Sequence, residues 1–321
     1  MQCRHDKETG SFAYSFLGPA NYEDPRSFGS YLDLPNKEKF NFVVPCGHCV
    51  GCRMDYVRDW THRMVYELIA YDYKAIFVTL TYDNDHLPMT IDGPSLSKRD
   101  CQLFMKRLRK AFRGRRIRYY IAGEYGPTTH RPHYHAILYG LSLADFSDLR
   151  KVGQNELKQP YFSSPKFAGI WKNGFVQMSE VNYSTCSYVA RYVTKKSYGL
   201  DLQEFAEKQP EFNLSSRCPG IGYSMASEVI LSGDSFDYFA LSDGQHTLSV
   251  PRSFYRHLKR NLSDLPEDQQ EYFLRKAYER SSDANSRLVS NVAFFGLPYK
   301  DYLQKNCSRL IANLRLLPQR K

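Results

Sequence analysis

Two histidines separated by one residue are the first feature of this sequence that suggests chemistry. His133 and His135 lie in a run of strand-forming residues, where alternate side chains point to the same face. If a hairpin pairs residue 124 with residue 133, the carboxylate of Glu124 joins the two imidazoles on that face. Such a nitrogen and oxygen site accepts Mg²⁺ or Mn²⁺ and leaves positions open for water and phosphate. Structural histidines on a buried strand are the alternative interpretation.

Two tyrosines on a predicted helix are the second feature. Tyr188 and Tyr192 are four residues apart and therefore share one helix face, and Lys195 and Lys196 follow within the next turn. A phenol with a pKa near 10 attacks a phosphodiester only with a cation or base nearby and a polarised phosphate. The lysines could supply the first requirement and a metal ion the second. A packed pair of core aromatic residues is the alternative.

A cluster of cysteines near the N-terminus suggests a second, structural metal. Its C-x-x-C-x-x-C spacing suits closure around one Zn²⁺, an iron–sulfur cluster being a second option and unligated thiols a third. The cluster and the candidates for a fourth ligand are Cys46, Cys49, Cys52, Cys3, His5 and His48. Cys101 and Cys186 fall within predicted helices and are expected in the core.

The elements that must position these residues follow from hydrophobic periodicity. Ser97 is a predicted N-cap with Asp100 at the third position of the helix that follows. The sequence predicts helices over 55–70, 97–111, 184–196, 253–260 and 268–280, and strands over 76–82, 117–124, 133–138 and 174–178. This order favours an α+β fold with a central antiparallel sheet and helices packed on one face.

The helix after Ser97 belongs to the densest block of positive charge in the chain. Residues 98–118 contain ten basic residues and one acidic residue, which indicates either a phosphate-contacting surface or a solvated helix face. The residues predicted to contact DNA are Lys106, Arg107, Arg109, Lys110, Arg113, Arg191 and Lys196.

Length and charge limit the classes of protein to which the chain can belong. With 321 residues, we expect a loop-rich segment over 1–60 that holds the cysteines, a main domain over 61–200 and a partly helical extension over 201–321. The net charge of +10 favours a polyanionic partner. We expect no membrane span and no signal peptide, because no apolar run approaches the ~20 residues a span requires. A reducing cytoplasm is the expected compartment.

Several motifs together resemble the HUH endonuclease superfamily, and more narrowly the replication initiators of microviruses of the gokushovirus branch. The histidine pair is preceded by Gly123-Glu124-Tyr125-Gly126 and followed by the two-tyrosine helix. Further matches are 77–82 with 85–88, 96–100, 45–53, 170–174 and 216–222. The match covers roughly residues 40–225 and implies an HUH or RRM-like fold.

The resemblance also implies roles for individual residues. His133, His135 and Glu124 would bind the divalent ion, and Tyr188 and Tyr192 would be nucleophiles, with Lys195 assisting. The implied reaction nicks a single-stranded origin, leaves a 5′-phosphotyrosine and a free 3′-OH for a host polymerase, and later rejoins the displaced strand. We find no Walker-type motif, which implies a host helicase.

Two rival interpretations remain. One is an HUH transposase or relaxase, and the other is a zinc-containing, basic DNA-binding protein without catalytic activity. Family members with two tyrosines often have a lysine three residues after each of them, whereas Arg191 follows Tyr188 here. Arginine keeps the charge but cannot donate a proton, so the two tyrosines are not expected to be equivalent.

Overall fold

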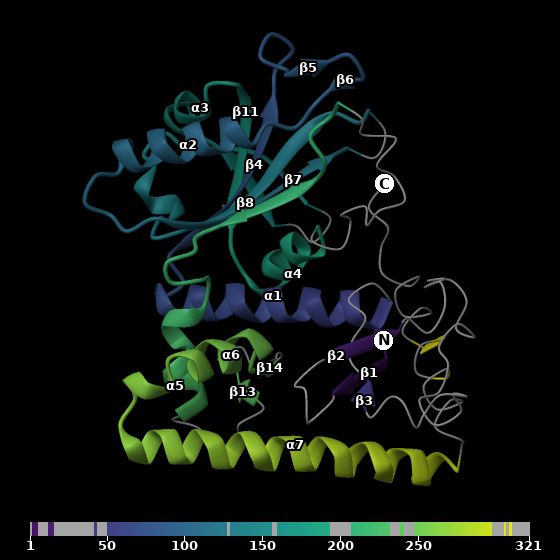
Figure 1. Ribbon diagram of the computed structural model, residues 1–321. Helices are drawn as coiled ribbons and strands as arrows, with labels where there is room; N and C mark the ends of the chain where they lie inside the picture. Colours follow the sequence, from purple (N-terminus) through teal and green to yellow (C-terminus); the bar gives the residue numbers. More distant parts are fainter. Residues whose placement is uncertain are drawn as a thin grey trace. The chain divides into compact units, whose positions relative to one another are not determined.

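The computed structural model describes two compact units of the chain (Figure 1). The larger comprises Val57–Gln270, and the smaller comprises Met1–Tyr56 with Glu271–Lys321. The described residues are 2–5, 12–15, 42–43, 50–126, 129–155, 159–192, 207–231, 238–240, 247–296, 305 and 308–309.

A seven-stranded antiparallel sheet is the centre of the larger unit. Its strand order is β12-β7-β8-β4-β11-β10-β9. The bounds are β4 (Ala75–Tyr82), β7 (Arg118–Tyr125), β8 (Pro132–Tyr139), β9 (Arg150–Gln154), β10 (Pro160–Ser163), β11 (Gly174–Glu180) and β12 (Phe212–Ser215). The predicted α+β class and antiparallel sheet are confirmed. The strands β9, β10 and β12 were not predicted, because their short segments lack a clear alternation.

Two helices, α2 (Lys98–Ala111) and α3 (Pro165–Trp171), cover one face of this sheet. The predicted cap is confirmed, since the Ser97 side chain accepts a hydrogen bond from the backbone nitrogen of Asp100. The apolar stripe of α2 meets the even-numbered residues of β4 and β8, while Phe104 and Trp171 pack edge to face. This face is the main hydrophobic core.

The opposite face of the sheet carries two other helices, α1 (Val50–Ala70) and α4 (Tyr183–Arg191). The hydroxyl of Tyr139 on β8 donates to the carbonyl of Met64 in α1, and Arg118 on β7 forms a buried ion pair with Glu67. Helices therefore lie on both faces, whereas the sequence analysis expected them on one. The difference arises because the long β8 is apolar on both faces, as a strand covered from both sides requires.

The remainder of the larger unit consists of short elements around the sheet. They are β5 (Met89–Thr90), β6 (Gly93–Pro94), α5 (Ala226–Leu231), β13 (Tyr238–Ala240), β14 (Thr247–Ser249) and α6 (Arg252–Arg260). β12 belongs to the sheet although it lies beyond residue 200, the predicted end of the main domain. The domain bounds remain a prediction.

The smaller unit contains a three-stranded sheet of β1 (Gln2–His5), β2 (Phe12–Ser15) and β3 (Phe42–Val43). Helix α7 (Glu267–Phe295) begins in the larger unit and is longer than the predicted helix over 268–280. It ends where Gly296 adopts a left-handed conformation with φ of 59°, a usual way to stop a helix. Within the described part of the chain, none of the helices combines the length and apolar character needed to cross a bilayer.

Candidate metal centre

The hairpin of β7 and β8 positions the three predicted metal ligands. Glu124 pairs with His133, and Ala122 pairs with His135, so the predicted register is confirmed. The turn of the hairpin is closed by a hydrogen bond from the backbone nitrogen of Gly126 to the carbonyl of Arg131. The Arg131 guanidinium in turn donates to the carbonyl of Tyr82 at 2.7 Å, which ties this turn to the end of β4.

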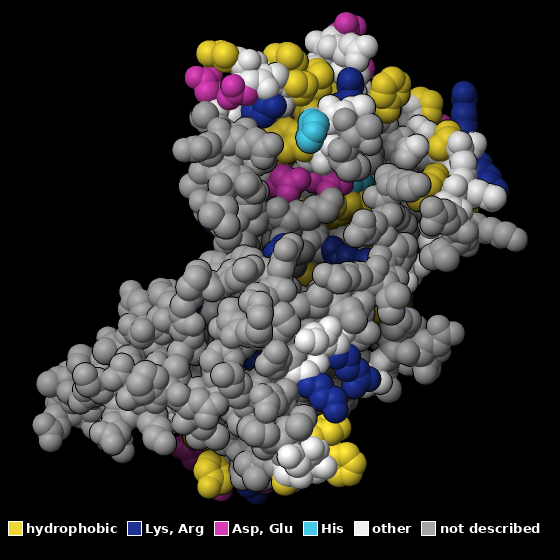
Figure 2. Space-filling view, turned by 90° about the vertical axis from the view of Figure 1, so that its right-hand side faces the viewer, with side chains coloured by type: hydrophobic (Ala, Val, Ile, Leu, Met, Phe, Trp, Pro, Cys, Tyr) yellow, Lys and Arg dark blue, Asp and Glu magenta, His cyan; other side chains and the backbone are white. Residues whose placement is uncertain are grey.

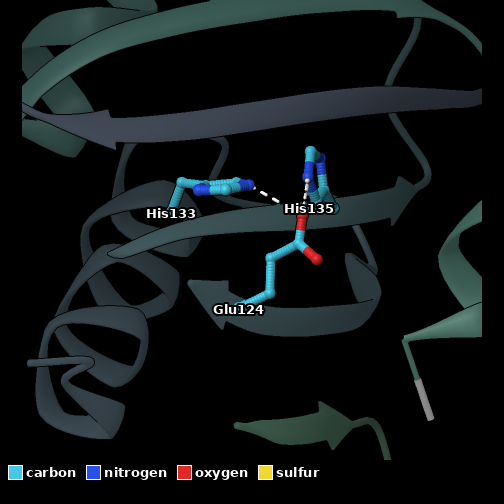
Figure 3. Close-up of side chains that lie close together, drawn as sticks. All are labelled: Glu124, His133 and His135. Atoms are coloured by element: carbon cyan, nitrogen blue, oxygen red, sulfur yellow. Dashed lines mark hydrogen bonds and ion pairs between the residues drawn. The ribbon is translucent and has the colours of Figure 1, made fainter. Parts of the chain in front are cut away.

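The three side chains converge on one point (Figure 3). Oε1 of Glu124 lies 2.7 Å from Nε2 of His133 and 3.0 Å from Nε2 of His135. The exposed fractions of the Glu124 and His135 side chains are 5% and 7%, against 19% for His133. The cluster is therefore mostly buried, with its solvent access on the His133 side. Figure 2 shows histidine and acidic side chains close to hydrophobic ones in the upper part of the molecule, where the sheet lies.

Neighbouring groups fix the orientation of both imidazoles. Nδ1 of His133 lies 3.1 Å from the carbonyl oxygen of Arg131, and Nδ1 of His135 lies 3.1 Å from Oγ1 of Thr79. The His135 ring is also stacked between Phe77 at 5.7 Å and Tyr192 at 4.9 Å between ring centroids. Such outer partners hold a ligating histidine in place and leave its Nε2 for the metal.

The geometry and chemistry of the cluster fit a divalent cation. Adjacent ligands of an octahedral ion with bonds of about 2.1 Å lie about 3.0 Å apart, close to the separations found here. Both ring nitrogens of His133 face acceptors, so a positive charge is needed between its Nε2 and the carboxylate. Burial alone would raise the pKa of Glu124, but hydrogen bonds with His133 and His135 outweigh it and hold this pKa well below its usual range. The carboxylate is thus available as an anionic ligand.

Helix α4 brings both predicted tyrosines to this cluster. The helix starts at an N-cap in which Oδ1 of Asn182 accepts from the backbone nitrogen of Thr185 at 2.9 Å. One face then presents Tyr188, whose hydroxyl lies 3.5 Å from Nε2 of His135. The rings of Tyr188 and Tyr192 meet edge to face, with 5.1 Å between their centroids.

The two tyrosines differ in their surroundings. Tyr188 is half-buried, whereas Tyr192 is buried and lies flat against His135. Burial, followed by the proximity of Tyr188 and of the Glu124 carboxylate, raises the pKa of Tyr192 well above its usual value. In this arrangement Tyr192 is therefore the weaker nucleophile of the two.

The basic residues of α2 lie away from the cluster, since α2 covers the other face of the sheet. Lys106, Lys110 and Arg113 are exposed there. The guanidinium of Arg107 donates to the carbonyls of Ile170 and Trp171 at 2.6 and 2.7 Å and thereby holds the C-terminal end of α3.

Arg109, also on α2, lies over the Tyr119 ring, whereas Arg191 is exposed at the end of α4, next to Tyr192. A role in DNA binding remains a prediction for all of these residues.

Several predicted site residues lie outside the described residues, namely Lys195, Lys196, Cys46, Cys49 and His48. Of the cysteine cluster, Cys52 is half-buried in α1. The backbone of Cys3 pairs with that of Phe42, four residues before Cys46. Cys101 and Cys186 are buried, which confirms that they belong to the core.

Thr79 and Phe77 are site residues to which the sequence analysis gave no role. Both lie on β4, and both contact His135. The sequence signal that could have found them is the alternation Phe77-Val78-Thr79-Leu80-Thr81, which puts a ring and two hydroxyls on the face opposite the apolar one.

Comparison with known proteins agrees with the fold and the site. Residues 75–197, which run from β4 beyond the end of α4, match the family of the replication-associated protein ORF2. The replication-associated protein ORF2 of Spiroplasma virus 4 is 31% identical over 292 residues, or 88% of each chain. The replication-associated protein VP4 of Bdellovibrio phage phiMH2K is 31% identical over 245 residues, which cover 74% of this chain and 73% of that protein. No solved structure matches.

A third relative is the replication-associated protein ORF4 of Chlamydia phage 1, which is 28% identical over 250 residues, or 74% of this chain and 58% of that protein. The relatives are phage proteins of one kind. The chain belongs to the replication-associated proteins of microvirus-type phages, as the motifs indicated.

Proposed function

We propose that this protein initiates rolling-circle replication by nicking single-stranded DNA at the phage origin. The observation that carries the proposal is the convergence of Glu124, His133 and His135, with the Tyr188 hydroxyl 3.5 Å from Nε2 of His135. Metal ligands and a nucleophile side by side are what phosphodiester transesterification requires. Membership of the phage replication-associated proteins supports the same function.

Mg²⁺ or Mn²⁺ would be held by Nε2 of both histidines and by the Glu124 carboxylate. When bound, the ion supplies Lewis-acid polarisation of the scissile phosphate. The protein's own contribution is to fix the ligands, since Thr79 and the Arg131 carbonyl orient the two imidazoles. The buried carboxylate also keeps a negative charge beside the open side of the cluster.

Tyr188 attacks first in this proposal, because its hydroxyl approaches the cluster from a half-buried position. A bond forms between its oxygen and the phosphorus, and the bond from phosphorus to the 3′-oxygen breaks. The phenolic proton passes to Lys195, the base that we propose, and the leaving 3′-oxygen takes up a proton. The products are a 5′-phosphotyrosine and a free 3′-OH.

Tyr192 acts in the second cleavage of the cycle, when the origin is regenerated and the displaced strand is rejoined. The ester bond energy is retained in the link to the protein, so no nucleotide is consumed. A host polymerase extends the 3′-OH and a host helicase opens the duplex, both in the cytoplasm of the host cell.

Two further assignments belong to the proposal. Cys46, Cys49 and Cys52 hold a structural Zn²⁺ with Cys3 as the fourth ligand, a choice favoured by the pairing of β1 with β3. The nicking domain spans about residues 61–200.

The test incubates the purified protein with labelled single-stranded DNA of its own phage origin and Mn²⁺, with and without EDTA. We expect protein-linked DNA on a denaturing gel only with the metal, and mass spectrometry should locate the link at Tyr188. The Tyr188→Phe protein should lose this first adduct. Tyr183→Phe, on the same helix, should keep it. Binding of origin DNA without any adduct would instead indicate a DNA-binding protein that does not cut.

A further inference from the structure

Phe175 on β11 is a large apolar side chain that is 68% exposed. One exposed apolar residue is ordinary, so its meaning depends on its neighbours. Phe175 lies opposite Thr81, Thr81 lies opposite His133, and His133 lies opposite Glu124. Residues directly opposite one another share a face of the sheet. Phe175 is therefore in the same cross-strand row as two of the candidate metal ligands.

The next row on this face leads away from the cluster in the same direction. It runs from His135 through Thr79 to Gln177, which is exposed. The two rows together form a surface that we call the β11 strip, made of Phe175, Gln177, Thr79 and Thr81. An aromatic ring, an amide and two hydroxyl groups are suited to an unpaired nucleic acid strand, whose bases stack and whose backbone accepts hydrogen bonds.

The spacing of the strip matches a chain of nucleotides. Phe175 is two strands away from His133, which is about 9.6 Å at the usual strand separation. Stacked nucleotides rise about 3.4 Å each, so a base on Phe175 would lie two to three nucleotides from a phosphate at the cluster.

The start of β11 is held firmly, so the Phe175 ring is in place before any ligand arrives. Gly174 has φ of 144°, and a side chain there would collide with the backbone of Thr81 and Asp83. The backbone nitrogen of Asp83 donates to the carbonyl of Asn173 at 2.9 Å, which closes the turn against β4. A preorganised aromatic contact loses little conformational entropy on binding.

Positive charge flanks the strip. Lys172 is exposed in the turn before β11. Arg150 on β9 is exposed opposite Ser163, and Ser163 follows Phe162, which pairs with Met178. Arg150 therefore lies at the far end of the row that contains Gln177. These cations complement a phosphate backbone that runs over the strip.

We propose that Phe175 stacks on a base of single-stranded DNA and thereby positions the scissile phosphate at the metal cluster. The proposal rests on the proposed function for the class of ligand, but it concerns binding and holds whether or not cleavage follows. It makes Phe175 a positioning residue.

The test measures fluorescence anisotropy of labelled dT20 in EDTA at several salt concentrations. Phe175→Thr keeps a strand-forming residue but removes the ring, and should weaken binding about 5- to 150-fold. Because no phosphate contact is lost, the slope of log K against log salt should stay unchanged, whereas Arg150→Ala should reduce it by about 0.7. Phe175→Tyr should bind like the parent protein.

The matched control is Tyr73→Asn, which removes an exposed ring at the other end of β4, where the positive φ of 59° suits asparagine. It should leave binding unchanged. Photocrosslinking of the parent protein to dT20 that carries 5-iododeoxyuridine tests the contact without any mutation, and should label Phe175. Parent-like affinity of a folded Phe175→Thr protein, a changed salt slope, or no label at Phe175 would each overturn the proposal.

These outcomes are separate from those of the nicking test. If the parent protein forms no adduct with origin DNA but Phe175→Thr loses affinity for dT20, the nicking proposal fails and Phe175 remains a stacking residue. If the adduct forms and Phe175→Thr binds normally, only the stacking proposal fails.

Discussion

The two faces of the same strands differ in what they do. On β8, Tyr134 is fully buried and bonds through its hydroxyl to Tyr82 at 2.8 Å, while its neighbours His133 and His135 lie on the other face with Glu124. Consecutive residues of one strand thus serve the core and the candidate site. The comparison teaches that stability and chemistry can be altered separately here, because the side-chain period of a strand is two.

The core face is closed by aromatic rings. Trp171 packs against Tyr82, Tyr134 and Phe104 with ring centroids 5.3 to 5.9 Å apart. The site face instead contains hydrogen-bonded polar groups that are partly open to solvent. Changes on the site face should therefore affect metal binding and nicking, and changes on the core face should affect the free energy of unfolding.

The largest effect is expected from removing both imidazoles. The His133→Ala/His135→Ala protein should form the DNA adduct at least about 10³-fold more slowly than the parent, since a bound metal ion contributes several kcal/mol to the transition state. The rate is measured from the adduct band on denaturing gels, and circular dichroism checks the fold. Nicking at the parental rate by the double variant would remove the cluster from the reaction.

A large effect on the other face is expected from Trp171→Ala. Loss of this fully buried side chain should lower the free energy of unfolding by about 3 to 5 kcal/mol, as measured by urea denaturation. The Mn²⁺ affinity of the folded variant should stay close to that of the parent, as measured by calorimetry. A strong loss of Mn²⁺ affinity in the folded variant would show that the two faces are coupled.

A smaller effect is expected from Thr79→Val, which removes the hydroxyl beside Nδ1 of His135 and keeps the shape of the side chain. The Mn²⁺ affinity should fall about 10- to 100-fold, as is usual when an outer partner of a metal-binding histidine is lost. Thr81→Val makes the same change on the same face and is the control, with Mn²⁺ affinity close to that of the parent. Equal affinities in all three proteins would contradict a role for Thr79 in orienting His135.

The smallest effect is expected from Ser97→Ala at the start of α2. Loss of the cap should lower the free energy of unfolding by about 1 kcal/mol. It should leave Mn²⁺ affinity unchanged, because α2 packs on the core face. Urea denaturation and calorimetry measure the two quantities, and unchanged stability would mean that the cap contributes nothing.

Much of the site could be predicted from the sequence because its signals are local. The His-x-His pair on a strand and its hairpin register with Glu124 depend on residues at most eleven positions apart, and both agree with the structure. The Ser97 cap and the two tyrosines on one helix face are local for the same reason. The relation to the phage replication-associated proteins also came from short motifs in a fixed order.

Other features were decided by the tertiary structure alone. Which helix covers which face depends on packing between distant segments, so the sequence analysis gave no sign that the basic helix α2 lies on the face away from the cluster. The contact of α4 with His135 joins residues 53 positions apart. The row from Glu124 to Phe175 requires the order of four strands, which no local pattern contains. The sequence by itself determined the ligands and their hairpin, while only the folded sheet determined what lies beside them, because strand order is set by long-range pairing.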